Sequence, residues 1–342
     1  MVNNLYIVTP RGFCAGVEMA IKALTWMLKI YDEPVYCYHE IVHNDWIVEK
    51  FKHKNVIFIE DPKELPENSI VMLSAHGTAP KIEDEFKNIS MTSVNSVCPL
   101  VTKVHHEAKR FTKDGKKIIY VGHKNHDEAK GALGVSPQNM HIVETIDDVD
   151  KLDIGENVAL LAQTTLAKSE WEPIMDYSKI KYPDLKMPRK SDLCYATTNR
   201  QQAITEILPY VNTVLVVGSD NSSNTQALVT MVNNNNVEVF RIDDVKDIEN
   251  LKLEGNIAIT AGASAPDHIV YEIIEKINPA ELENFKPIEE AEYFPLPQQL
   301  RANIKNVSDF LSIFNTSGSN PKSEYGISND KKWTATEALN SL

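Results

Sequence analysis

Apolar residues recur along the chain with two periods, which together predict alternating helices and strands. After Cys14, the residues Val17, Ala20, Ile21 and Leu24 recur at the three- and four-residue spacing of one helical face. The apolar run LYIVTP precedes this cysteine and is typical of a strand. We therefore expect Cys14 to stand between a strand and the N-terminus of a helix.

Two other cysteines occur in the same local setting. Cys98 follows the β-type segment TSVNSV and precedes Pro99, a residue that is favoured in the first turn of a helix. Cys194 precedes a helical pattern in which Ile204 and Ile207 share one face. All three cysteines are therefore predicted at or just before a helix N-terminus.

The strands repeat at a constant offset from these cysteines. An apolar run ends 25 residues after each one, at His39, His123 and Ser219 (39 − 14, 123 − 98 and 219 − 194). A further strand-like run follows in each case, over residues 69–78, 157–166 and 256–265. Polar residues come after these runs, so we expect polar side chains at the carboxyl ends of parallel strands, where α/β proteins bind ligands.

This repetition predicts an α/β fold of three pseudo-threefold-related units, with mainly parallel sheets around a central site. The expected divisions are 14–97, 98–193, and 1–13 with 194–290, followed by a C-terminal segment at 291–314 and a mobile tail at 315–342. The tail is predicted to be mobile because it is rich in Ser, Asn, Thr and Gly and lacks apolar periodicity. Three units around one axis would bring the three cysteines together.

Composition narrows the class of protein. The 342 residues are 42% hydrophobic and 24% charged, which is ordinary for a globular chain. The net charge of −13 argues against a general nucleic-acid or anionic-membrane binder. No run approaches the roughly 20 apolar residues of a membrane span, and we see no signal peptide. Four widely spaced cysteines are unlike a secreted disulfide scaffold, so we expect a cytoplasmic protein.

Three cysteines at equivalent positions are typical of a metal site. They could bind zinc or an iron–sulfur cluster, and no pair has the CxxC spacing of a zinc ribbon. In a [4Fe–4S] cluster, thiolates from Cys14, Cys98 and Cys194 leave one iron open to bind a substrate oxygen. Cys37 lies inside a predicted strand without equivalents and is interpreted as an inert core residue.

The polar residues after the strands indicate an anion site. Three histidines at strand ends could ligate a metal or donate to an anion, namely His43, His76 and His126. The third unit carries hydroxyls and an amide that suit phosphate oxygens, at Ser222, Ser223, Asn224 and Ser264. Ordinary turn formation is the alternative for this group. Five other histidines are interpreted as surface or capping residues, namely His53, His105, His106, His141 and His268.

Glu128 is the best candidate for a proton donor. A carboxyl in a dry central cavity has a raised pKa and can deliver protons. Its neighbour Asp127 is a rival, and a solvated loop glutamate is the alternative. Thr164, at the matching strand end of the second unit, could hydrogen-bond a substrate hydroxyl or orient Glu128.

Eight motifs in order give the chain a specific resemblance. They are RGFCAGV, EIVHN, SAHG, CPLVTKVH, QTTL, CYATTNRQ, VVGSDNSSN and TAGASAPD, and they span roughly residues 5 to 290. In these motifs the chain resembles the family of 4-hydroxy-3-methylbut-2-enyl diphosphate reductases (IspH/LytB).

The resemblance implies an oxidoreductase of the last step of the non-mevalonate isoprenoid pathway. Two electrons and protons remove an allylic hydroxyl, giving isopentenyl and dimethylallyl diphosphates. A [4Fe–4S] cluster would be held by Cys14, Cys98 and Cys194, with its open iron taking the hydroxyl. The diphosphate would bind to His43, His76, His126, Ser222, Ser223, Asn224 and Ser264. Glu128 would relay protons, aided by Thr164 and His126, and a ferredoxin or flavodoxin would deliver the electrons.

The chain departs from the family pattern in two places. Asp127 stands where the family commonly has proline, and this change could loosen the loop that carries Glu128. Residues 95–97 read Asn-Ser-Val where the family more often has Asp-Ala-Thr, which affects packing before Cys98.

Two other functions stay open on the residues alone. The first is a zinc hydrolase with three cysteine ligands and Glu128 as general base. The second is a non-catalytic α/β protein that binds an anion and keeps its cysteines in the core. The metal content and colour of anaerobically purified protein separate these functions from the reductase.

Overall fold

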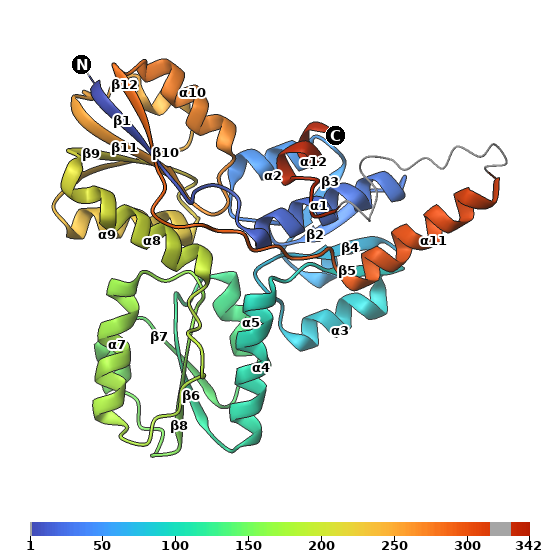
Figure 1. Cartoon of the computed structure of the whole chain (residues 1–342). Coiled ribbons are helices and arrows are strands. Elements are labelled where there is room, and N and C mark those ends of the chain that lie inside the picture. Colours follow the sequence, from blue (N-terminus) through green and yellow to red (C-terminus); the bar gives the residue numbers. More distant parts are fainter. Residues whose placement is uncertain (1, 315–329) are drawn as a thin grey trace.

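Three separate parallel sheets form the framework of the molecule and lie around a common centre (Figure 1). The computed structural model describes residues 2–314 and 330–342. All strand pairs within these sheets are parallel. The carboxyl ends of the strands therefore share one edge in each sheet, which is the edge where polar residues were expected.

The largest sheet joins the first and the last strand of the described chain. Its strand order is β10-β9-β11-β1-β12. The strands are β1 (Val2–Val8), β9 (Thr213–Val217), β10 (Glu238–Ile242), β11 (Gly255–Ala261) and β12 (Glu281–Phe285). The interior strand β9 is buried at all of its positions, as its apolar sequence TVLVV predicts for a parallel strand covered on both faces.

The other two sheets are smaller and each uses a continuous stretch of chain. One has the order β3-β2-β4-β5, and the other has the order β7-β6-β8. Their strands are β2 (Val35–Tyr38), β3 (Val56–Ile59), β4 (Ile70–Leu73), β5 (Thr92–Asn95), β6 (Lys117–Val121), β7 (Met140–Val143) and β8 (Val158–Ala162). The predicted α/β class with mainly parallel sheets is confirmed, whereas the proposed boundaries between units stay predictions.

Helices connect and cover the strands (Figure 1). They are α1 (Ala15–Ile30), α2 (Asp45–Lys52), α3 (Pro80–Ile89), α4 (Pro99–Lys113), α5 (Asp127–Val135), α6 (Ile146–Asp150), α7 (Lys168–Lys181), α8 (Tyr195–Ile207), α9 (Ser223–Asn234), α10 (Asp267–Ile277), α11 (Gln298–Phe314) and α12 (Ala335–Asn340). Short 3-10 turns span Pro62–Glu64, Leu208–Tyr210 and Val245–Ile248.

The three equivalent cysteines occupy the position immediately before a helix. Cys14, Cys98 and Cys194 are the N-cap residues of α1, α4 and α8. The expected placement at helix N-termini is therefore confirmed. Backbone N–H groups that have no partner within the helix point outward at these ends, where they favour a thiolate or another anion.

The C-terminal residues correct one expectation. The prediction of a mobile tail over 315–342 is wrong for residues 330–342, where α12 packs against α1. The residues buried in the same core as α1 are Trp333, Ala335, Ala338 and Leu339. This apolar face is short and lies among polar residues, so its periodicity is weak in the sequence. Residues 315–329 lie outside the described part of the chain.

A close approach between α5 and the loop after β4 sets the spacing of two predicted site residues. A Cβ atom on Gly131 would lie 2.6 Å from the carbonyl oxygen of Gly77. His76 precedes that glycine, and His126 is the N-cap of α5. The absence of a side chain at Gly131 therefore lets these two histidines approach each other.

We expect Gly131→Ala to destabilise the protein by roughly 2 kcal/mol, because backbone atoms of the facing loop must shift. Helix propensity alone would stabilise the variant by about 1 kcal/mol, so close packing and helix propensity predict opposite changes in the free energy of unfolding. Chemical unfolding measures the difference, with Lys130→Ala on the exposed side of α5 as control. An increase in stability would contradict the close packing.

Candidate functional site

The residues predicted for chemistry line one cavity of about 100 Å³, which we call the inner cavity. The predicted residues in its lining are Cys14, His43, His76, Cys98, His126, Glu128, Thr164, Cys194, Ser222, Ser223, Asn224 and Ser264. They come from helix N-termini and from loops after strands in all three sheets. The structure thus brings all twelve candidates together.

The three thiols are free and partly buried within this cavity. A Cβ atom on Gly16 would lie 3.0 Å from Cys98 Sγ and 3.9 Å from Cys14 Sγ, so these sulfur atoms flank the glycine. The backbone N–H of Thr197 donates to Cys194 Sγ at 3.2 Å. Burial raises the pKa of all three thiols, that of Cys194 to about 11. Three thiolates here therefore require a bound cation.

The arrangement of the thiols indicates the kind of metal group that would fit. Among the described residues, no three His, Cys, Asp or Glu side chains are gathered closely enough to hold a single metal ion. A tetrahedral zinc ion needs its sulfur ligands about 2.3 Å away. Three thiols from three helix N-termini around one cavity suit a cluster of several metal atoms. Cys37 is fully buried in β2 and does not line the cavity, as expected for a core residue.

Three histidines gather at another part of the wall. The rings of His43 and His76 are stacked with centroids 3.9 Å apart, and His126 stands edge-on to His43 at 5.1 Å. The Nε2 atom of each ring is buried without a hydrogen-bond partner in the described structure. Burial lowers the pKa of His76, and it lowers that of His126 to about 3. Three unpartnered ring nitrogens are suited to an anion that supplies the missing contacts and charge.

The hydrogen bonds of two rings define which protons they can offer. His126 Nδ1 accepts from the backbone N–H of Glu128 at 3.1 Å, so the neutral ring carries its proton on Nε2. His126 can therefore donate into the cavity without being charged. His43 Nδ1 instead lies 3.1 Å from Glu40 Oε2 and donates to this carboxylate. A ring that donates through Nδ1 can donate through Nε2 as well only when both nitrogens carry protons.

The polar residues of the third unit already form hydrogen bonds with other parts of the protein. Ser264 Oγ donates to the backbone carbonyl of His43 at 2.8 Å. Asn224 Nδ2 donates to Thr197 Oγ1 at 3.0 Å, and Asn224 Oδ1 accepts from the backbone N–H of Ala263 at 3.1 Å. These contacts orient the residues of the wall and join it to the helix that follows Cys194. Their predicted role as diphosphate ligands stays a prediction.

Glu128 and Thr164 form a buried pair. Thr164 donates its backbone N–H to Glu128 Oε1 at 2.7 Å, and the Thr164 hydroxyl lies 2.9 Å from Oε2. Burial raises the pKa of Glu128 to about 7, against the lowering effect of the bonds from Thr164. The carboxyl is thus close to half-protonated at neutral pH, which is the condition that suits a general acid.

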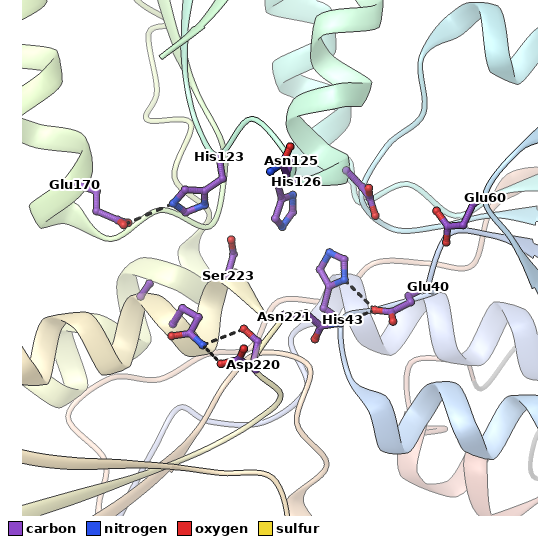
Figure 2. A pocket seen from close by; sticks show the side chains of 13 residues that line it. Glu40, His43, Glu60, His123, Asn125, His126, Glu170, Asp220, Asn221 and Ser223 are labelled. Carbon is purple, nitrogen blue, oxygen red and sulfur yellow. Dashed lines mark hydrogen bonds and ion pairs between the residues drawn. The ribbon is translucent and has the colours of Figure 1, made fainter. Parts of the chain in front are cut away.

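Asp127 lies outside the inner cavity and is not placed as a second acid there. It is the first residue of α5, where a carboxylate is favourable, and it pairs with Lys130 at 3.2 Å. It lines an outer pocket that adjoins the inner cavity at His43, His126 and Ser223 (Figure 2). His126 caps α5 directly ahead of Asp127, and the loosening of the loop stays a prediction.

Sequence reasoning missed several residues of the site. Tyr195 and Phe294 also line the inner cavity, and Arg200 is a buried cation beside the cysteine loops. The position of Tyr195 next to Cys194 was the available signal, whereas nothing near Phe294 in sequence indicates the site. The surface or capping interpretation of His105 is wrong, because His105 is buried against the loop at Gly77 and burial lowers its pKa to about 4.

Comparison with known proteins places this geometry in a family. A model of the LytB protein family matches residues 5–278. The chain belongs to the LytB family. No helix in the described residues of this LytB chain is long and apolar enough to cross a bilayer.

Relatives and solved structures agree with this assignment. The chain is 38% identical over 307 residues to the 4-hydroxy-3-methylbut-2-enyl diphosphate reductase of Vesicomyosocius okutanii, covering 87% of this chain and 100% of the relative. It is 40% identical over 309 residues to the reductase of the same name from Cutibacterium acnes, covering 87% and 95%. The structure of E-1-hydroxy-2-methyl-but-2-enyl-4-diphosphate reductase from Plasmodium falciparum superposes with a TM-score of 0.85 at 34% identity, over 90% of this chain and 99% of that one.

We expect the raised pKa of Glu128 to make stability depend on pH. The folded protein binds this proton more tightly than the unfolded chain does, whose carboxyl titrates near 4.5. The stabilisation is complete below that value and is lost as the pH rises through about 7. Relative to Glu128→Gln, the wild type should lose up to about 3 kcal/mol between about pH 5 and pH 8. Urea unfolding at both values measures this, and a constant difference would contradict the raised pKa.

Proposed function

We propose that the chain is a 4-hydroxy-3-methylbut-2-enyl diphosphate reductase with a [4Fe–4S] cluster held by Cys14, Cys98 and Cys194. The observation that carries the proposal is one cavity lined by three thiols, three unpartnered imidazole nitrogens and a carboxyl of raised pKa. The names of the relatives support the same reaction. When bound, the cluster would supply two electrons in sequence and an iron without a protein ligand.

The imidazoles are the proposed clamp for the diphosphate. His126 offers an N–H in its neutral form, and His43, whose Nδ1 donates to Glu40, adds a second buried Nε2 to the same cavity. His76, stacked on His43, contributes a third ring nitrogen. Ser222 and Ser223 add hydroxyls at the N-terminus of α9, where backbone N–H groups also favour phosphate. Ser264 and Asn224 complete the wall.

The allylic hydroxyl leaves as water, so the enzyme must deliver protons while the electrons arrive. Glu128 Oε1 already accepts the Thr164 backbone N–H, which leaves the proton of the neutral acid on Oε2. There it donates to Thr164 Oγ1, whose own hydroxyl hydrogen is then free to point toward substrate. The pair can pass a proton toward the leaving oxygen in this way. The burial of Glu128 keeps competing water away from the acid.

The two alternative functions are less well supported. A zinc hydrolase needs ligands gathered around one ion, and the described residues contain no such group. A non-catalytic anion binder has no need for a carboxyl with a pKa of about 7 beside the anion site. The electron donor, a ferredoxin or flavodoxin, and a cytoplasmic location stay part of the proposal.

The decisive experiment combines anaerobic iron and sulfide analysis with an assay on the hydroxylated C5 diphosphate. About four irons per chain and a brown colour are expected for a [4Fe–4S] site. One zinc in a colourless protein would support the hydrolase, and a metal-free protein without turnover would support the binding protein.

Glu128→Gln should keep the cluster and lose most of its turnover, by roughly a hundredfold or more, because the proton donor is removed. Steady-state rates with a strong chemical reductant measure the loss, and the visible absorption spectrum checks the cluster. Asp127→Asn is the matched control and should keep near wild-type activity. Equal effects of the two substitutions would end the assignment of Glu128 as the donor.

Cys98→Ser should lower cluster content itself, because a serine hydroxyl replaces one of three thiolate ligands. Cys37→Ser is the control, since this residue lies in β2 away from the cavity. Iron content per chain after anaerobic purification is the measurement. Full iron in Cys98→Ser would contradict ligation by three cysteines.

A further inference from the structure

The chain between β12 and α11, residues 286–297, crosses the middle of the molecule (Figure 1). We call this segment the strap. Upstream, the backbone N–H of Thr9 donates to the carbonyl of Phe285 at 2.9 Å, and downstream Leu296 is buried in the core with α1. No backbone–backbone hydrogen bond involves residues 286–296 in the described structure. The middle of the strap therefore depends on its side chains for attachment.

Tyr293 donates its hydroxyl to Asp330, and one ion pair attaches the strap on the side of the cysteine loops. Both carboxylate oxygens of Glu290 lie 3.1 Å from Arg200 Nη1, and Asn199 Nδ2 donates to Oε2 at 3.1 Å. The Arg200 side chain is 1% exposed and also donates to the carbonyls of Gly12 and Ala196, at 2.8 and 2.9 Å. Arg200 thus joins the strap to the loop before Cys14 and to the helix after Cys194.

The strap also contributes a wall to the site. Phe294 lines the inner cavity together with the three cysteines and with Tyr195. The rings of Phe294 and Tyr195 meet edge to face, with centroids 6.3 Å apart. An aromatic pair beside the thiols separates them from solvent on this side.

The two charges of the ion pair lie close to two of the thiols along the chain. Arg200 bonds the carbonyl of Gly12, two residues before Cys14, and that of Ala196, two residues after Cys194, while Glu290 contacts Arg200 directly. Both charges are therefore near enough to change the electrostatic potential at a group held by these thiols.

We propose that the Arg200–Glu290 pair fastens residues 286–297 across the thiol end of the inner cavity, and that its charges set the reduction potential of the group held there. The proposal rests on the proposed function for the identity of that group. Residues 286–297 lie beyond residue 278, where the family match ends. Arg200 and Glu290 are positioning residues in this account, acting through the strap and the cysteine loops.

Release of the strap can be tested without any metal. In metal-free enzyme, Glu290→Ala should speed alkylation of Cys14 and Cys194 by N-ethylmaleimide roughly tenfold, because local opening becomes more frequent. Mass spectrometry maps the sites, and the buried Cys37 serves as internal reference for global unfolding. Glu289→Ala is the matched control, since this neighbouring carboxylate is 81% exposed and pairs only with Lys286 among the described residues. Equal labelling rates in the two variants would overturn the proposal that Glu290 holds the strap over the thiols.

The effect of the two charges is tested in the holoenzyme by the direction in which the midpoint potential shifts. Glu290→Gln removes a negative charge and should raise the midpoint potential, whereas Arg200→Gln removes a positive charge and should lower it. Loss of structure alone would not move the two variants in opposite directions. If Arg200→Gln fails to fold, Arg200→Lys keeps the charge and should leave the potential near the wild-type value. Shifts of equal sign, or no shift in Glu290→Gln, would overturn the electrostatic role.

The two proposals can fail separately. A wild-type enzyme without iron would end the proposed function, whereas the labelling of metal-free enzyme would still decide whether the strap covers the thiols. The enzyme could also bind iron while its thiol labelling rates and its midpoint potential do not change on substitution of Glu290. That result would leave the reductase assignment intact and overturn the proposed role of the strap.

Discussion

Removal of water from ionisable groups in the inner cavity is the constraint on which the rest of the site depends. Burial raises the pKa values of the three thiols and of Glu128, and it lowers those of His76 and His126. Each group therefore favours its neutral form until a ligand brings a compensating charge. A cation is required by the thiols and an anion by the imidazoles, so the site suits two ligands of opposite charge side by side.

The repeated architecture explains how one cavity collects such different groups. Each cysteine precedes a helix, and the other polar residues follow strands whose carboxyl ends face the centre. The repeats are not chemically equal, however. Histidines serve the first two units, whereas the third supplies hydroxyls and an amide already bonded to their surroundings. This asymmetry gives the cavity one wall of imidazoles and another wall of hydroxyls and an amide.

The sequence predicted the α/β class, the helix N-termini at the cysteines and the set of residues around the cavity, because these follow from local periodicity and from a repeat. It failed where the deciding contact is distant in the chain. His105 was interpreted as a surface or capping residue although it is buried against the loop at Gly77, and α12 was interpreted as part of a mobile tail although its apolar face packs on α1. Asp127 was a rival acid in sequence and faces the outer pocket in space.

The amino-acid sequence by itself determined which groups are available and in what order along the chain: three equivalent thiols, three strand-end histidines and a carboxyl two residues beyond one of them. Residue type and repeat period encode these properties, which do not depend on contacts between residues distant in the chain. The tertiary structure alone decided that Glu128 bonds Thr164, that Glu290 reaches Arg200 across the molecule, and that Phe294 joins the cavity. Those contacts join residues far apart in the chain, and their strength comes from burial, which only the packed fold creates.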